Sequence, residues 1–163
     1  MTKNYYADLM PKDFDSFDCL KIAPGVYFIL LFVLRAYIVW IMSVTNMRDH
    51  VGIIQWVFPQ TSLFYLNLAS GFFGVFIVFL LSLRKPNAAR WVKVSWKKCH
   101  IFLILALLFD LAASVFGYIV WHLQSISWLL MHCGVVIISI SYIMLSKRFA
   151  INLTEFPQKL PEK

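Results

Sequence analysis

Four long apolar runs dominate the chain, and the polar residues gather between them. The runs cover residues 26–44, 63–83, 100–121 and 126–145, and each has about the 20 residues that a helix needs to cross about 30 Å of hydrocarbon. The apolar residues follow one another directly, without the two-residue period of a strand or the 3.6-residue period of a surface helix. The pattern predicts an all-α membrane protein: one domain over residues 1–163, folded as a bundle of four transmembrane helices.

Composition and the distribution of positive charge give this bundle a direction. Hydrophobic residues make up 61% of the chain and charged residues only 14%, whereas about a quarter of the residues in a soluble domain are charged. Most Lys and Arg residues precede the first run, separate the second from the third, or follow the fourth. Positively charged segments stay in the cytoplasm. We therefore expect both termini to be cytoplasmic, and we interpret the net charge of +7 as a result of topology rather than of nucleic-acid binding.

The segment between the second and third runs, RKPNAARWVKVSWKK, mixes basic and aromatic residues. Each basic group near an anionic leaflet contributes about 1 kcal/mol, and tryptophan prefers the membrane interface. We expect an interfacial helix here that contacts anionic lipid headgroups at the cytoplasmic face through Arg84, Lys85, Arg90, Trp91, Lys93, Trp96, Lys97 and Lys98. The apolar segment 51–59 is too short to span, and we expect it to lie along the outer surface or to fold back onto the bundle.

Two formal charges interrupt the runs, Arg35 in the first and Asp110 in the third. A charge in mid-membrane costs about 3 kcal/mol on insertion scales, so such groups usually face a partner inside the bundle. At a rise of 1.5 Å per residue, the two lie at depths of about 16 and about 15 Å. The opposite signs and matched depths predict an intramembrane ion pair.

Small residues on the helix that carries Asp110 favour the close approach of another helix. Ala106, Ala113 and Gly117 share the helical face of Asp110, and the second run offers Ser70, Gly71 and Gly74. On the first run, the face of Arg35 is expected to include Phe28, Leu31 or Phe32, Val39 and Met42. Candidate polar neighbours of the pair on the fourth run are His132, Ser139 and Tyr142.

The ion pair has two interpretations. It is either a latch that fixes the register of the helices, or a proton or anion site, because ionisable groups inside a membrane often mark pathways. A proton relay needs further titratable groups at successive depths, and only His132 meets this need. We therefore favour the latch.

Other chemistry has little support in the sequence. His50, His122 and His132 are expected near the outer face, but their spacing matches no zinc signature, and His100 lacks a partner at matched depth that would hold haem. We find no glycine-rich phosphate loop, nucleophile elbow or HExxH motif. We predict no metal, no cofactor and no enzymatic activity.

Several motifs in the first half of the chain resemble a known family. They are Leu20-Lys21 followed by Pro24, Leu34-Arg35 within an aromatic-rich span, Ser43, Arg48, Val57-Phe58-Pro59, Phe64, Leu66, Gly71 and the basic exit at Arg84. The order resembles the YfeZ-like family of small bacterial inner-membrane proteins of unknown function, most closely over residues 14–85. The resemblance implies a location in the bacterial cytoplasmic membrane, and it implies no activity or cofactor.

Three hypotheses of function follow. The leading one is a non-enzymatic accessory or scaffold subunit that associates with itself or with a larger membrane complex. The second is a small transporter or proton-coupled carrier that uses Arg35 and Asp110. The third is a redox subunit that holds haem, quinone or metal near the outer histidines.

Overall fold

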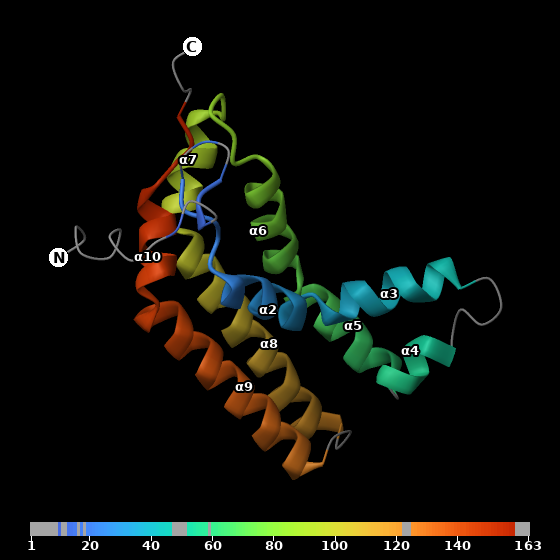
Figure 1. The fold of residues 1–163 in the computed structure, drawn as a ribbon. Coiled ribbons are helices and arrows are strands. Elements are labelled where there is room, and N and C mark those ends of the chain that lie inside the picture. The colour runs from blue at the N-terminus through green and yellow to red at the C-terminus, as the bar shows by residue number, and fades with distance from the viewer. Residues whose placement is uncertain are drawn as a thin grey trace.

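The computed structural model describes residues 10, 13–15, 17, 19–46, 52–58, 60–121 and 125–158, and this part of the chain is mainly helical (Figure 1). The helices are α2 (Pro24–Val33), α3 (Arg35–Thr45), α4 (Gly52–Val57), α5 (Thr61–Ser70), α6 (Phe72–Ser82), α7 (Arg90–Lys97), α8 (Cys99–Trp121), α9 (Ile126–Leu145) and α10 (Lys147–Thr154). The prediction of an all-helical chain is therefore confirmed for the described residues.

Three helices in the described part are long and apolar enough to cross a membrane. They are Thr61–Ser82, which joins α5 and α6, Cys99–Val120 in α8, and Ile126–Leu145 in α9. The helices α2 and α3 pass the same test only together, and they are bent by 66°. The structure thus contains three candidate spans, or four if the bent pair counts as one.

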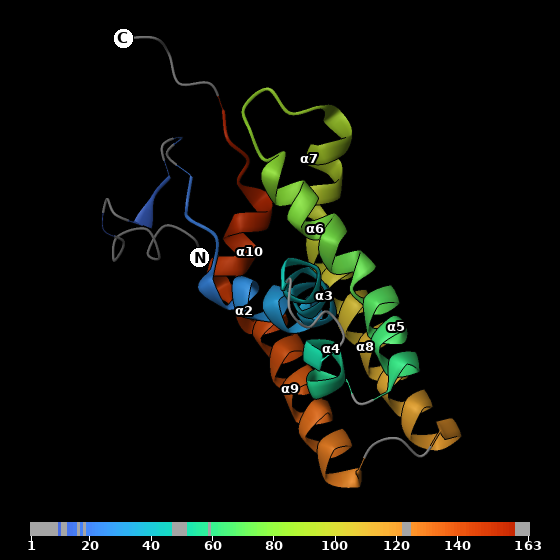
Figure 2. The same ribbon diagram turned by 90° about the vertical axis from the view of Figure 1, so that its right-hand side faces the viewer.

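The first predicted span, residues 26–44, is not the continuous helix that we expected. It breaks at Leu34, and Arg35 begins α3. The Nη1 of Arg35 donates a hydrogen bond of 2.9 Å to the carbonyl oxygen of Phe32, and a side chain that inserts into the backbone ladder is a common cause of kinks. As a result, α2 and α3 run across the α8–α9 hairpin instead of alongside it (Figures 1 and 2).

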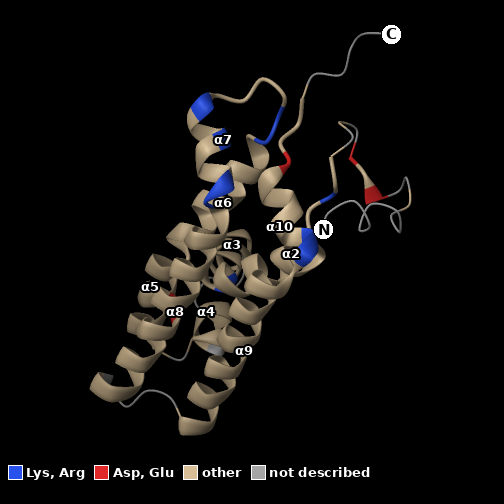
Figure 3. Ribbon diagram, turned by 90° about the vertical axis from the view of Figure 1, so that its left-hand side faces the viewer, with Lys and Arg blue, Asp and Glu red and all other residues tan. Residues whose placement is uncertain are grey.

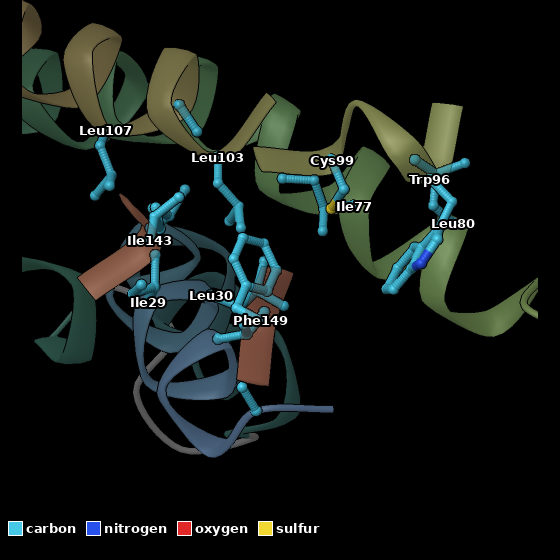
Figure 4. Close-up of a cluster of buried hydrophobic side chains, with 14 of the residues drawn as sticks. Ile29, Leu30, Ile77, Leu80, Trp96, Cys99, Leu103, Leu107, Ile143 and Phe149 are labelled. Atoms are coloured by element: carbon cyan, nitrogen blue, oxygen red, sulfur yellow. The ribbon is translucent and has the colours of Figure 1, made fainter. Parts of the chain in front are cut away.

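The bend also changes which residues of the first run face inward. Phe28, Leu31 and Met42, which we placed on the face of Arg35, are more than half exposed. The buried residues of α2 are instead Val26, Ile29, Leu30 and Val33. In Figure 4, Ile29 and Leu30 lie close to Ile143 and Phe149, on the side of α2 that faces Leu103 and Leu107 of α8. One face of α2 therefore packs into the main hydrophobic core.

Glycine allows a close approach where the two broken helices meet. A Cβ atom at Gly71, between α5 and α6, would lie 2.8 Å from the ring of Tyr37 and 3.2 Å from the carbonyl oxygen of Val33. Any larger residue would push α5 and α6 away from the bend between α2 and α3. The small surface predicted on the second run is thus used for helix packing.

Asn152 of α10 ties the N-terminal segment to the bundle. Its Oδ1 accepts a hydrogen bond of 2.9 Å from the amide of Ala23, and its Nδ2 donates one of 2.8 Å to the carbonyl oxygen of Leu20. The indole Nε1 of Trp96, in α7, donates one of 2.7 Å to the backbone carbonyl oxygen of Asn152. Residues 20–23, α7 and α10 therefore meet at one end of the bundle, opposite the α8–α9 connection (Figure 2).

The contact between Trp96 and Asn152 corrects our prediction that Trp96 faces lipid headgroups. Trp96 is only 1% exposed, and Asn152 of α10 and Arg84 lie against it, so we were wrong to expect this side chain at the lipid surface. Arg84 is half-buried, lies 5.1 Å above the ring of Trp96 and donates to the carbonyl oxygen of Glu155 at 3.3 Å. Burial lowers the pKa of this guanidinium.

The other residues of this segment that we predicted to contact lipid headgroups are exposed. They are Lys85, Arg90, Trp91, Lys93, Lys97 and Lys98. Figure 3 shows most of the charged residues near α7, α10 and the start of α2, while the far halves of α8 and α9 carry none among the described residues. The charge asymmetry in the sequence is therefore also an asymmetry between the two ends of the structure.

The apolar segment 51–59 takes one of the two expected arrangements. Its helix α4 folds back, and Ile53 and Ile54 pack against a cluster that includes Val39, Phe58 and Phe64. This cluster holds α3, α4 and α5 together beside the α8–α9 hairpin.

Candidate functional site

Arg35 and Asp110 meet in a two-pronged ion pair at the centre of the bundle. The Nη1 and Nη2 atoms of Arg35 lie 2.9 and 3.1 Å from the two carboxylate oxygens of Asp110. The Asp110 side chain is fully buried, whereas a quarter of the Arg35 side chain is exposed. Paired hydrogen bonds of this kind fix orientation as well as charge, so the pair holds the start of α3 against the middle of α8.

The Asp110 carboxylate has two further donors. The hydroxyl of Ser70 donates to Oδ1 at 3.0 Å, and the Nε2 of His132 lies 3.0 Å from Oδ2. A carboxylate has about four acceptor positions, and Arg35, Ser70 and His132 fill them. The carboxylate is therefore compensated from three helices, α3, α5 and α9, and it has little capacity to receive a further ligand.

The guanidinium of Arg35 is also almost fully engaged. Besides Asp110, it donates to the carbonyl oxygen of Phe32 and to the side-chain oxygen of Asn67, and its carbon lies 4.6 Å from the centre of the Phe32 ring. Asn67 is oriented in turn by a hydrogen bond of 2.8 Å from its Nδ2 to the carbonyl oxygen of Leu63. The network links α3, α5, α8 and α9 (Figure 1).

The structure brings together some of the predicted residues but not all. His132 joins the network and contacts the ring of Phe32 at 5.2 Å. Tyr142 lies instead against Gly25, at the start of α2. Ser139 is buried, but among the described residues it makes no hydrogen bond to the pair. His50 and His122 lie outside the described residues.

Two polar residues of the site were not among our predictions. Asn67 is three residues from Ser70, and Ser114 is four residues from Asp110, so each shares a helical face with a group that we had singled out. The hydroxyl of Ser114 lies 3.5 Å from the Nε2 of His132. Helical spacing from Asp110 would have revealed Ser114, and helical spacing from Ser70 would have pointed to Asn67.

A cavity of about 590 Å³ adjoins the network. Its polar wall consists of Arg35, Asn67, Ser114, Ser125 and His132. Its apolar wall consists of Phe32, Val57, Phe58, Leu63, Trp128, Met131 and Val135. Asp110 does not line the cavity, so a molecule inside would meet a mainly apolar lining with a few polar side chains and no carboxylate.

The described residues offer no metal site of the usual kind. No group of three His, Cys, Asp or Glu side chains among them is close enough to hold an ion. The chemistry that this part of the chain does offer is hydrogen bonding to acceptor oxygens in an apolar enclosure.

Comparison with known proteins points to a family without an assigned function. The family described as "Protein of unknown function (DUF2919)" matches residues 9–155, a stretch that contains every member of the buried network. The searches of curated proteins and of solved structures found no match. The match extends well past residues 14–85, where the resemblance described above is strongest, and the YfeZ-like assignment stays a prediction.

Proposed function

This chain belongs to the DUF2919 family, and we propose that it is a non-enzymatic accessory or scaffold subunit with four spans in the bacterial inner membrane. The path of the chain supports four crossings. Ala23 contacts α10 at one end of the bundle, whereas Leu63, near the start of α5, lies against Gly117 toward the other end. The broken pair α2–α3, together with α4, covers the distance between them.

The charge distribution supports cytoplasmic termini. The end of the bundle that contains α7 and α10 carries most of the described Lys and Arg residues (Figure 3), and positively charged segments are retained in the cytoplasm. The exposed side chains of Lys85, Arg90, Lys93, Lys97 and Lys98 would then face the anionic headgroups of the inner leaflet.

The observation that carries the subunit proposal is Gly134 on α9. A Cβ atom built there meets no atom within 4 Å, so packing within the chain does not explain this glycine. Ser127 and Ser141, one heptad to either side, are exposed and share its face. Because small residues on membrane helices admit a second helix closely, this face of α9 would dock against another membrane protein or a second copy of the chain.

The test is a matched pair of substitutions in the full-length tagged protein, purified in mild detergent. Gly134→Leu should release the co-purifying protein, or dissociate the homo-oligomer, without lowering the melting temperature. Ala112→Leu enlarges an exposed small residue of α8 and should leave the assembly intact. A monomer without any companion, or an assembly that Gly134→Leu does not disturb, would overturn the proposal.

A second candidate, a small transporter or proton-coupled carrier, draws on the break in the first span. Broken membrane helices often form the substrate site of transporters, and here Arg35 stands at the break and lines the cavity. In proteoliposomes, Asp110→Asn should slow the flux of a transported solute or of protons. Equal flux in parent and variant, or none in the parent, would remove this candidate.

A further inference from the structure

The cavity beside the charge network has a chemical character that differs from that of the α9 docking face. Its polar lining includes the side chains of Arg35, Asn67 and Ser114. Its apolar lining includes Trp128 and Met131, which are 55% and 54% exposed. In a bilayer this side would open to lipid, so a lipophilic molecule could enter directly from the membrane.

Charge balance argues for a neutral ligand. Arg35 already pairs with Asp110, and the carboxylate has its full set of donors. A further anion would leave an uncompensated charge in a medium of low dielectric constant, which is unfavourable. A neutral carbonyl oxygen needs only a donor, and hydrogen bonds to charged donors are the stronger ones. The Nη1 and Nη2 atoms of Arg35 each already make two hydrogen bonds, so its Nε–H is the charged donor that remains.

The shape and lining narrow the ligand further. Phe32, Phe58 and Trp128 place aromatic rings in the wall, and aromatic faces favour a planar conjugated partner. A cavity of about 590 Å³ lies within the range of about 300–1,000 Å³ that is usual for small-molecule sites. We propose that this cavity binds a neutral lipophile with a planar carbonyl-bearing ring, the chemistry of a quinone, with its oxygen toward Arg35 and Ser114.

Binding can be tested separately from the subunit proposal, because Gly134 does not line the cavity, although Met131 lies one helical turn from it. Gly134→Leu should therefore leave binding unchanged, so failure of the docking test does not affect this site. Quinone binding alone also does not establish electron transfer, and no redox step is part of the proposal.

The test uses the purified full-length protein in detergent, with decylubiquinone as the probe. Quinones quench indole fluorescence, so titration should give saturable quenching with one site per chain, and Trp128→Phe should remove most of that signal. Ser114→Ala should weaken binding about fivefold, the equivalent of one hydrogen bond of about 1 kcal/mol. Equilibrium dialysis of the probe measures the affinity of both variants independently of fluorescence.

Occlusion of the cavity supplies the decisive comparison. Val135→Phe, in the apolar wall, should abolish saturable binding, whereas Ile138→Phe, on the exposed side of the same helix, should leave it unchanged. Phenyldecane has a ring and a tail but no carbonyl, and palmitate has a tail and a carboxylate but no ring. Both should bind at least tenfold more weakly than decylubiquinone. Tighter binding of palmitate, equal binding of phenyldecane, or unchanged affinity in both Ser114→Ala and Val135→Phe would overturn the proposal.

Discussion

Removal of one partner from the buried ion pair should destabilise the bundle by an amount that depends on which partner is removed. Arg35→Leu leaves Asp110 fully buried, with only Ser70 and His132 as donors. Loss of one partner from a buried pair costs about 3–5 kcal/mol. Because the remaining carboxylate has no access to water, we expect Arg35→Leu to lie near the upper limit, at about 5 kcal/mol.

The reverse change should be milder. Asp110→Leu leaves the guanidinium of Arg35 with two acceptors, Phe32 and Asn67. Its carbon also stays 4.6 Å from the centre of the Phe32 ring, so the unpaired cation keeps more partners than the unpaired carboxylate does. We expect a loss of about 3 kcal/mol. The double variant has no unpaired charge and should be more stable than Arg35→Leu alone.

The free energy of unfolding of the four proteins can be measured by titration of mixed dodecylmaltoside micelles with sodium dodecyl sulfate, followed by circular dichroism. A double-mutant cycle then gives the coupling energy directly. Losses that add without coupling, or a larger loss for Asp110→Leu than for Arg35→Leu, would refute the assignment of Asp110 as the more deeply buried partner.

Two further predictions concern packing and the N-terminal segment. Gly71→Ala should clearly lower the melting temperature, because the new Cβ would lie 2.8 Å from the ring of Tyr37. Gly74→Ala should lower it less, because its Cβ would meet only side-chain atoms, at 3.0 Å. Equal melting temperatures for the two variants would contradict the close contact at the bend. Asn152→Ala leaves the amide of Ala23 without its side-chain acceptor, at a cost of about 1–3 kcal/mol. Tryptic cleavage after Lys21 should then be faster than in the parent and in a Thr154→Ala control, and unchanged cleavage would argue against the tether.

The sequence predicted the helices well because hydrophobic runs of this length have few alternatives in a membrane protein. Three of the four runs coincide with continuous apolar helical segments. The prediction of one continuous helix for the first run was wrong because the sequence has no proline or glycine near Leu34 that would mark a break. The break arises from tertiary contacts, in which the guanidinium of Arg35 bonds to Phe32 and to Asp110 on another helix.

The site was predictable as far as charge and depth can determine it. A lone cation and a lone anion in apolar surroundings had to find polar partners, and the structure places Arg35 and Asp110 in contact. Uncharged polar residues give a weaker signal, so Asn67 and Ser114 escaped notice. The burial of Trp96 was not predictable from local pattern, because the group that covers it, Asn152, lies 56 residues away.

The tether at Asn152 has a consequence for the order of events during synthesis. Its hydrogen bonds to Leu20 and Ala23 join residues 132 and 129 positions apart, so the segment ahead of α2 cannot make these contacts until the ribosome has produced α10. Nascent chains that stop before α10 would lack this closing contact. Synthesis of α10 thus completes this contact, and a chain truncated before α10 should leave residues 20–23 more open to proteases.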